Sequence, residues 1–435
     1  MLLHPAYHLV NTAVIGQQEN SIENLAIFGL ATVTYSIAIM SIQFAFNNSL
    51  TTLISQAHGQ GEPRLCSVYM NRQLILNVIV YVPLATLLLF SKYFFIAIGQ
   101  EEDFAQKTAE FVYILLPGLY FFGCFHTYSK YLAGQREVSF QMYTNFLTIV
   151  LHIPITYLLA VYYGYGLNGV GWATSIHYLL RFLIIFTFTK LSQFNKHMVS
   201  LRDPDCYRNL MPQFKMSLYA MTMIIWTWWA FDMFTFMSSF MTTSVMAAQT
   251  VCRNITLMFY MIPVGLSQAT SISVGNMIGK RNLQGAKTYA LWCTITASAW
   301  GILSVLTMVI FGNMIILFFS EQEEVRSLVQ KAFVLIGFYI FFECIQCIGS
   351  GIISGIGRQG KGSIFTLIGF WVIGIPISAT QVFYYKAGIE ALWFGPTLAH
   401  FFNSVCYYCL IVKQDWRVII QESEERRLKE KNKFT

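Results

Sequence analysis

Apolar runs of about twenty residues recur along the whole 435-residue sequence, and a helix of that length is needed to cross the hydrocarbon core of a bilayer. The sequence is 55% hydrophobic and only 11% charged. Soluble domains carry about 25% charged residues, so this composition excludes an ordinary soluble protein. The net charge of +7 is accounted for by basic loops between spans and does not indicate a nucleic-acid partner. These features predict an all-α polytopic membrane protein in contact with membrane lipid.

The apolar runs predict about twelve membrane spans. They cover residues 1–16, 25–46, 70–92, 109–133, 138–162, 167–190, 215–239, 244–274, 288–318, 329–353, 362–385 and 390–413. The first run rises only about 24 Å, so it predicts a shortened first helix or a start codon placed too late, and the sequence does not decide between them. It lacks the basic flank and cleavage site of a signal peptide.

The loops between these spans alternate in charge. Those that follow even-numbered spans are basic, with residues such as Arg64, Lys196 and Lys280, whereas those that follow odd-numbered spans carry acids such as Glu101 and Glu321. The positive-inside rule therefore predicts that both termini are cytoplasmic. The sequence does not distinguish the plasma membrane from an endomembrane such as the vacuolar membrane.

Three short matches at a nearly constant offset, close to half the length of the chain, indicate an internal repeat. Gly59 and Gly279 close similar segments, Ile-Pro-Ile motifs begin at positions 153 and 375, and similar glycine-led segments begin at positions 166 and 388. The repeat predicts two six-helix halves, residues 1–191 and 214–413, related by an axis along the membrane normal with a cavity between them. Residues 192–213 would form a cytoplasmic linker and 414–435 a cytoplasmic tail.

Two acidic residues lie inside predicted spans, Asp232 in the seventh and Glu343 in the tenth. An ionised carboxylate at the centre of a bilayer costs several kcal/mol, so such residues usually take part in the movement of ions or substrates. The structural alternative is that each is paired, protonated or in contact with water. The pair favours an ion-coupled carrier.

The position of Arg253 predicts which of the two acids, Asp232 or Glu343, is able to gain and lose a proton. The turn between the seventh and eighth spans centres near residue 242, so an antiparallel hairpin places Asp232 and Arg253 at a similar depth. An ion pair between them would hold Asp232 ionised and remove it from proton coupling. Glu343 has no basic residue at its own depth, and we therefore rank it above Asp232 as the coupling residue.

Several segments resemble the multidrug and toxin extrusion (MATE) family, eukaryotic type, over nearly the whole chain. The segments are Leu53–Gly59 (LISQAHG), Leu116–Gly118 with Lys130–Leu132, Trp228–Asp232 (WWAFD), Met261–Gly279, and Glu343–Gln359 with its Gly355-Ile356-Gly357-Arg358-Gln359 turn. The resemblance implies a V-shaped bundle of two lobes. It also implies exchange of an organic cation or drug-like molecule for a proton, or for sodium in some members.

The resemblance further implies which residues line the cavity. It places coupling acids at Asp232 and Glu343, and polar residues at three positions where family acids are common, Thr227, Asn254 and Asn11. Aromatic rings near the acids could stack on a flat cation, each contributing about 0.5–2 kcal/mol. The full set of cavity candidates is Trp228, Trp229, Tyr339, Asn254, Thr227, Asn11 and Gln56. This cavity is less acidic than the family pattern, so coupling by proton or by Na⁺ stays open.

Other features favour no enzymatic or metal chemistry. The pairs Cys344/Cys347 and Cys406/Cys409 have metal-ligand spacing, but on apolar helices such cysteines are usually packing residues, and we expect neither a metal site nor a cofactor. Four histidines on separate spans are expected to make interhelical hydrogen bonds, with a role as proton relays as the alternative: His126, His152, His177 and His400. A monomer suffices for a carrier whose cavity lies within one chain.

Three alternatives to an antiporter remain at this point. A flippase for lipid-linked precursors would need a basic cavity, and Arg181 and Arg253 are few for that purpose. A membrane-embedded transferase would need a cluster of histidine and acid that the sequence lacks. A degenerate paralogue that folds but does not transport is suggested by the short first span and the missing acids.

Overall fold

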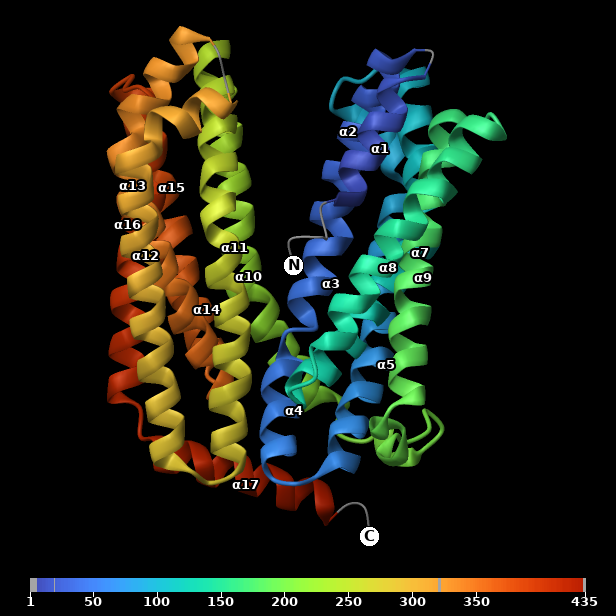
Figure 1. Ribbon diagram of the computed structural model, residues 1–435, viewed down its shortest axis with the longest axis vertical. Helices are drawn as coiled ribbons and strands as arrows, with labels where there is room; N and C mark the ends of the chain where they lie inside the picture. Colours follow the sequence, from blue (N-terminus) through green and yellow to red (C-terminus); the bar gives the residue numbers. More distant parts are fainter. Residues whose placement is uncertain (1–5, 19, 320–321, 433–435) are drawn as a thin grey trace. The chain divides into compact units, whose positions relative to one another are not determined.

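The computed structural model describes residues 6–18, 20–319 and 322–432, and every regular element in those ranges is helical. Figure 1 shows long helices joined by short connections. The first six predicted spans correspond to α1 (Ala6–Gly16), α2–η1–α3–α4 (Ser21–Gly59), α5 (Pro63–Leu89), α7 (Glu102–Gly134), α8–η2 (Ser139–Tyr162) and α9 (Gly166–Leu191). The next six correspond to α10 (Leu210–Ser238), α11 (Thr243–Gly279), α12 (Leu283–Phe319), α13 (Glu323–Gly355), α14–η5–α15–η6 (Gln359–Tyr384) and α16 (Ile389–Lys413).

Nine of these helices, counted over the described ranges, are long and apolar enough to cross a membrane. The predicted spans at α1, α10 and α16 are not among the nine. The described part of α1 has 11 residues, which gives a rise of about 16 Å and is shorter than a hydrocarbon core. The prediction of an all-α polytopic membrane protein is confirmed.

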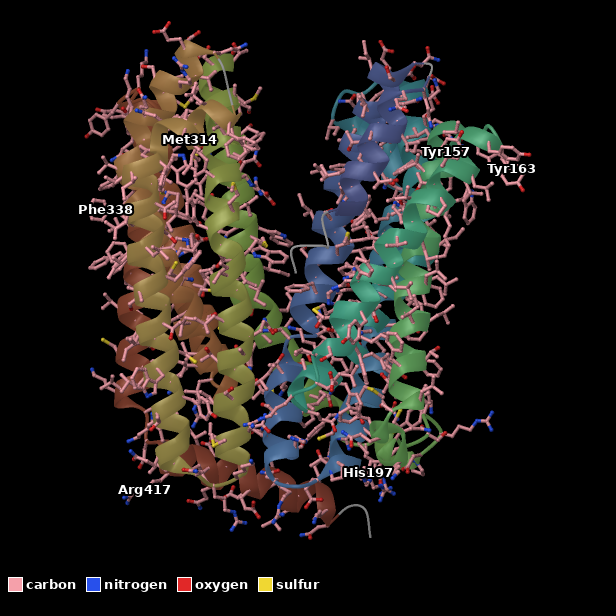
Figure 2. The ribbon with its side chains drawn as sticks, viewed as in Figure 1. Tyr157, Tyr163, His197, Met314, Phe338 and Arg417 are labelled. Carbon is pink, nitrogen blue, oxygen red and sulfur yellow. The ribbon has the colours of Figure 1, made fainter. Side chains whose placement is uncertain are left out.

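Large apolar side chains project from the outer surfaces of the helices, as membrane helices require. Phe338 and Met314 are 55% and 70% exposed, and Tyr163 is 56% exposed. Figure 2 shows Phe338 and Tyr163 at the two margins of the view, pointing outward. Residues of this kind would be costly in water, and their exposure is explained by contact with lipid.

The chain divides into two compact units. Unit 1 comprises Met1–Leu50 and Glu62–Ser217, and unit 2 comprises Thr51–Gly61 and Leu218–Thr435. Unit 1 therefore includes the segment 192–209, with the short 3-10 helices η3 (Gln193–His197) and η4 (Pro204–Cys206). Most of α4 (Ser49–Gly59), which the repeat assigns to the first half of the sequence, belongs to unit 2.

The backbone carries the internal repeat more clearly than the sequence does. Residues with positive φ recur in pairs, as Gly61 with Arg281, Arg136 with Gly357, and Gly164 with Lys386. The members of each pair are separated along the chain by nearly the same interval as the repeated sequence motifs. The π-helical segments η2 (Leu158–Tyr162) and η6 (Thr380–Tyr384) are separated by that interval too. A left-handed residue after a helix is a specific turn geometry, so these coincidences show that the two halves are built on one pattern.

Within unit 2, α4 crosses the end of α11 at two glycines. A β-carbon on Gly59 would lie 2.2 Å from the backbone oxygen of Asn276, and one on Gly279 would lie 2.1 Å from that of Gln56. Neither position has room for a side chain, so glycine lets the two backbones touch. Thr52 and Gln56 of α4 then donate hydrogen bonds to the carbonyl oxygens of α13, at Ser354 (2.5 Å) and Gly355 (3.0 Å).

A final helix, α17 (Trp416–Lys431), runs across the ends of α11 and α12 (Figure 1). Trp416 and Ile419 are buried in the core of unit 2. Further along the helix, Glu422 pairs with Arg358 at 2.8 Å and Glu424 pairs with Arg281 at 2.7 Å. Ser423 donates to the side-chain oxygen of Gln56 at 3.1 Å. The helix thus fastens the ends of α4, α11 and α13 together.

In unit 1, the segment 192–209 is held by arginines. Arg72 is buried and donates through Nε and Nη2 to the carbonyl oxygen of Asp205, at 3.1 and 2.9 Å. Arg64 pairs with Asp203 at 3.1 Å and with Asp205 at 2.9 Å. The backbone N–H of Asp205 and then the Arg64 guanidinium hold the pKa of Asp203 below its usual range. This segment is therefore an ordered part of unit 1.

Candidate functional site

Glu343 is buried in the middle of α13. Its side chain is 7% exposed, and its Oε1 accepts a hydrogen bond of 2.6 Å from the hydroxyl of Tyr339, one turn earlier on the same helix. The other oxygen, Oε2, is buried and has no hydrogen-bond partner among the described residues. Within those residues Glu343 forms no salt bridge, so its charge has no fixed counter-ion.

The position of Glu343 follows from the packing of α13, which lies against α11, α12 and α16. Glycines let these helices approach closely. A β-carbon on Gly351 would lie 2.5 Å from the carbonyl oxygen of Ser267 on α11, and one on Gly349 would lie 3.2 Å from Tyr407 on α16. A helix enclosed in this way shields its polar side chains from water. Leaving a carboxylate oxygen unpaired in such a place costs about 1–3 kcal/mol.

Asp232 has a different environment. Its Oδ1 lies 2.9 Å from Nη2 of Arg253, and Nη1 of Arg253 donates to Thr235 at 3.0 Å. The two side chains are 38% and 37% exposed. The pair joins α10 and α11 on either side of their connecting turn, the arrangement that an antiparallel hairpin requires. Asp232 is thus a paired and half-exposed acid, whereas Glu343 is buried and has no salt bridge within the described residues.

Aromatic rings enclose the Tyr339–Glu343 pair. The Tyr339 ring lies 5.6 Å from Phe231 of α10, 5.2 Å from Trp393 of α16 and 4.8 Å from His400 of α16, each nearly edge-on. His400 also lies 5.0 Å from Phe370 of η5 (Ile368–Gly374). Rings from α10 and α16 therefore pack against the tyrosine that bonds Glu343, and η5 contributes a ring beside His400.

The other predicted site residues are spread more widely. Trp228, Trp229 and Thr227 are partly buried on α10, and the indole N–H of Trp229 has no hydrogen-bond partner in the described residues. Asn254 of α11 is exposed. Of these candidates, the structure brings Tyr339 into direct contact with Glu343.

Two of the candidates lie away from the acids. Gln56 is 3% exposed and takes part in the contacts among α4, α13 and α17. Asn11 belongs to unit 1, where its amide donates to Thr174 at 2.9 Å and its oxygen lies 2.9 Å from Nε2 of His152. Each is a buried amide whose hydrogen bonds join helices.

The prediction of interhelical hydrogen bonds holds for His152 but is wrong for His400. His400 is 2% exposed, yet neither ring nitrogen has a hydrogen-bond partner in the described residues. Its neighbours are aromatic rings contributed by α10, α13 and η5, which offer no acceptor. One signal in the sequence was available, because Trp393, Thr397 and His400 recur at helical spacing and share the face of α16 that packs on α13.

Over the described residues, no group of three or more His, Cys, Asp or Glu side chains is arranged to hold a metal ion. What the site offers is one carboxyl group without a counter-ion, in an enclosed, aromatic and polar setting within a polytopic helical bundle. Such a group can bind a proton or a cation, and intramembrane carboxyl groups of this kind are usually found where ions or substrates move.

Comparison with known proteins gives the family. The chain belongs to the MatE family, because the family model matches residues 1–158 and 219–380. Multidrug and toxin extrusion protein 1 of Danio rerio is 25% identical over 403 residues, which cover 92% of this chain and 68% of that protein. Protein DETOXIFICATION 16 of Arabidopsis thaliana is 24% identical over 85% of this chain and 77% of its own length.

Solved structures show the same fold. The crystal structure of the eukaryotic MATE transporter AtDTX14 superposes with a TM-score of 0.88 at 21% identity, over 97% of this chain and 94% of that one. A mutant of the Vibrio cholerae MATE transporter VcmN gives a TM-score of 0.85 at 15% identity, over 96% of this chain and 95% of that one. The sequence-based assignment to the MATE family and to its helical fold is therefore confirmed.

Proposed function

We propose that this protein is a secondary active antiporter that exports organic cations or drug-like molecules in exchange for protons, by alternating access. The observation that carries the proposal is Glu343: a buried carboxyl group with one free oxygen, no salt bridge within the described residues and a tyrosine donor on its other oxygen. The names of its relatives, which refer to multidrug and toxin extrusion, support the substrate class.

The chemistry of coupling follows from charge. The ionised carboxylate attracts a cation, whereas the protonated form does not, so a proton and a cationic substrate compete for one group. Asp232 has less freedom to act in this way, because Arg253 neutralises it at 2.9 Å. Aromatic side chains near the acids, Trp228, Trp229 and Tyr339, supply ring faces for a flat cation.

The environment of the arginines favours an antiporter over a flippase for lipid-linked precursors. Arg253 pairs with Asp232, and Arg181 donates two hydrogen bonds to Asn145 and lies over the Phe125 ring. Both are bonded to side chains of this chain. A pyrophosphate headgroup would require a cluster of basic side chains free to bind it.

The remaining features of the proposal rest on the sequence. The charge alternation of the loops supports cytoplasmic termini, in the plasma membrane or an endomembrane. Proton or sodium serves as the coupling ion, without any cofactor, and a monomer is sufficient.

The test is uptake of tetraethylammonium into proteoliposomes driven by an outward proton gradient. We expect Glu343→Gln to reduce uptake by about tenfold or more, the scale of coupling free energies between sites. The matched comparison is Asp232→Asn, which removes an acid of the paired kind and should retain most of the uptake. Uptake that persists in Glu343→Gln would show that Glu343 is not the coupling residue. Absence of gradient-driven uptake in the wild type, for a panel of cations and with sodium, would favour a non-transporting paralogue.

A further inference from the structure

His400 is a buried titratable residue that the proposed function leaves unused. A neutral imidazole has one N–H donor and one acceptor nitrogen. In His400 both are buried and neither is hydrogen-bonded within the described parts of the chain. Leaving both groups unsatisfied in a protein interior is destabilising, so a residue of this kind requires an explanation other than stability.

Tyr339 joins His400 to Glu343. The hydroxyl of Tyr339 is 2.6 Å from Oε1 of Glu343, and the Tyr339 ring packs edge-on against His400, with centroids 4.8 Å apart. Glu343 Oε2 is itself without a hydrogen bond in the described ranges. Two titratable groups, each with unsatisfied atoms, thus contact the same tyrosine from neighbouring helices.

Two more polar side chains, with atoms unpartnered in the described residues, lie one helical turn beyond Glu343 and His400, on α13 and α16. Gln346 follows Glu343 by one helical turn on α13, and Asn403 follows His400 by one helical turn on α16. The side-chain oxygen of Gln346 and both amide atoms of Asn403 are buried without a hydrogen bond in the described residues. An apolar interior would not favour four such side chains on two packed helices, and together they form a polar interior suited to holding a proton.

Among the described residues, the groups packed around His400 carry no charge other than that of Glu343. Its ring contacts come from Tyr339 on α13, Phe231 on α10 and Phe370 on η5. The titratable groups electrostatically coupled to Glu343 are Tyr260 of α11 and Cys344 and Cys347 of α13. A phenol and two thiols have ordinary pKa values above about 8 and are neutral at pH 7. Asp232, next to Phe231, is neutralised by Arg253.

We propose that His400 and Glu343 share one proton, so that His400 is a second proton acceptor of the unit 2 site. A proton that leaves a hydronium ion adds either to Glu343 Oε2 or to the acceptor nitrogen of His400. It returns to a water molecule on the other side of the membrane. When the proton is on the imidazole, the carboxylate remains negative, and Tyr339 contacts both charged groups. The inference rests on the proposed proton antiport and adds a group to its site.

The direct test observes the histidine without any substrate. Protein labelled with ¹⁵N-histidine is reconstituted in nanodiscs, and ring nitrogen shifts are recorded between pH 9 and pH 5. The signal absent from His400→Gln identifies the residue. We expect it to gain a second ring proton as the pH falls, and its midpoint to drop by about one pH unit or more in Glu343→Gln, since a nearby carboxylate favours the charged form. The matched control is Glu323→Gln, which removes an exposed carboxylate from the start of the same helix and should leave the midpoint unchanged.

Two results would overturn the proposal: an imidazole that stays neutral throughout, or one that titrates identically with and without the Glu343 carboxylate. A second measurement uses the transport assay. Removing one of two proton acceptors lowers the total proton affinity, so the pH of half-maximal uptake should be lower in His400→Gln than in the wild type. An unchanged midpoint would also contradict the proposal. Failure of wild-type uptake would instead count against antiport, because the spectroscopic titration requires no substrate.

Discussion

Gly59 and Gly279 show how much a single residue can matter where two helices cross in unit 2. The internal repeat makes them counterparts, and the structure places them against each other, since a β-carbon on Gly279 would lie 2.9 Å from the α-carbon of Gly59. The obstacles are backbone atoms, which cannot rotate away as the end of a side chain can. Close approach of α4 and α11 therefore depends on the absence of a side chain at both positions.

Gly279→Ala should destabilise the protein by about 1–3 kcal/mol, the usual cost of overpacking a core. Thermal unfolding in detergent, followed by tryptophan fluorescence, measures the change. The matched control is Gly265→Ala on the same helix, where an added β-carbon meets nothing within 4 Å. That variant should be neutral or slightly more stable, because alanine is the better helix former. Equal behaviour of the two variants would contradict a tight crossing at Gly279.

The two intramembrane acids differ in how far the sequence could predict them. The pairing of Asp232 with Arg253 follows from counting residues outward from a turn, because both lie on one hairpin. The surroundings of Glu343 do not follow in this way. Phe231 and His400 contact Tyr339 from two other helices, and hydrophobic periodicity does not say which helix faces which. His400 was consequently assigned an ordinary hydrogen bond, which is absent among the described residues.

Among the elements, α17 is held against the end of α13 by an ion pair. Arg358 lies at the turn after α13, and Glu422 lies on α17, with Nη1 and Oε2 2.8 Å apart. Arg358 also donates to Gln414 at 3.3 Å, just before α17 begins. These contacts hold the start of α17 against the turn of residues 356–358.

Glu422→Arg should lower the free energy of local opening of α17, because it replaces an ion pair with two arginines, at positions 358 and 422. We expect faster amide hydrogen exchange throughout residues 416–431, by about tenfold if the local free energy of opening falls by about 1.4 kcal/mol. The double variant Glu422→Arg with Arg358→Glu restores an opposite-charge pair and should recover most of the protection. If the double variant exchanges as fast as the single one, the ion pair does not hold the helix.

Each of the twelve predicted ranges overlaps a helix of the structure, because a membrane requires its spans to be apolar over a sufficient length, and nine of the helices in the described ranges meet that requirement. The sequence did not predict that most of α4 belongs to unit 2, because that requirement does not apply to a segment buried in protein. Residues 51–59 are buried in protein rather than in lipid, and their small and amide side chains do not reveal which part of the chain receives them. The positive-φ residues that mark the repeat could not be recognised from the sequence either. In each pair one half has glycine and the other has a basic residue: Arg136, Arg281 or Lys386.

At the scale of the whole molecule, the assignment of Thr51–Gly61 to unit 2 predicts how a cut chain behaves. A protease site introduced at Leu201–Arg202, which is exposed, divides the chain into an N-terminal and a C-terminal fragment. We expect the two fragments to copurify in mild detergent, because α4 of the first fragment packs on α11, α13 and α17 of the second. Arg64 and Arg72 of the first fragment also hold Asp203 and Asp205 of the second. In a background of Arg64→Ala and Arg72→Ala, Gly59→Val combined with Gln56→Ala should therefore lower the fraction that copurifies, as measured by size-exclusion chromatography. Fragments that separate without these substitutions would contradict the assignment.

The placement of α4 also limits how relatives of this protein can recombine. A chimera that joins the first half of one member to the second half of another brings an α4 from one parent against an α11 from the other. It can fold only if both parents keep small residues at the positions of Ser55, Gly59, Gly275 and Gly279, where side-chain volume is excluded. The two halves of this chain are similar, but residues 51–61 of the first half pack in unit 2. A larger side chain on either side of the α4–α11 crossing therefore requires a compensating change on the other side.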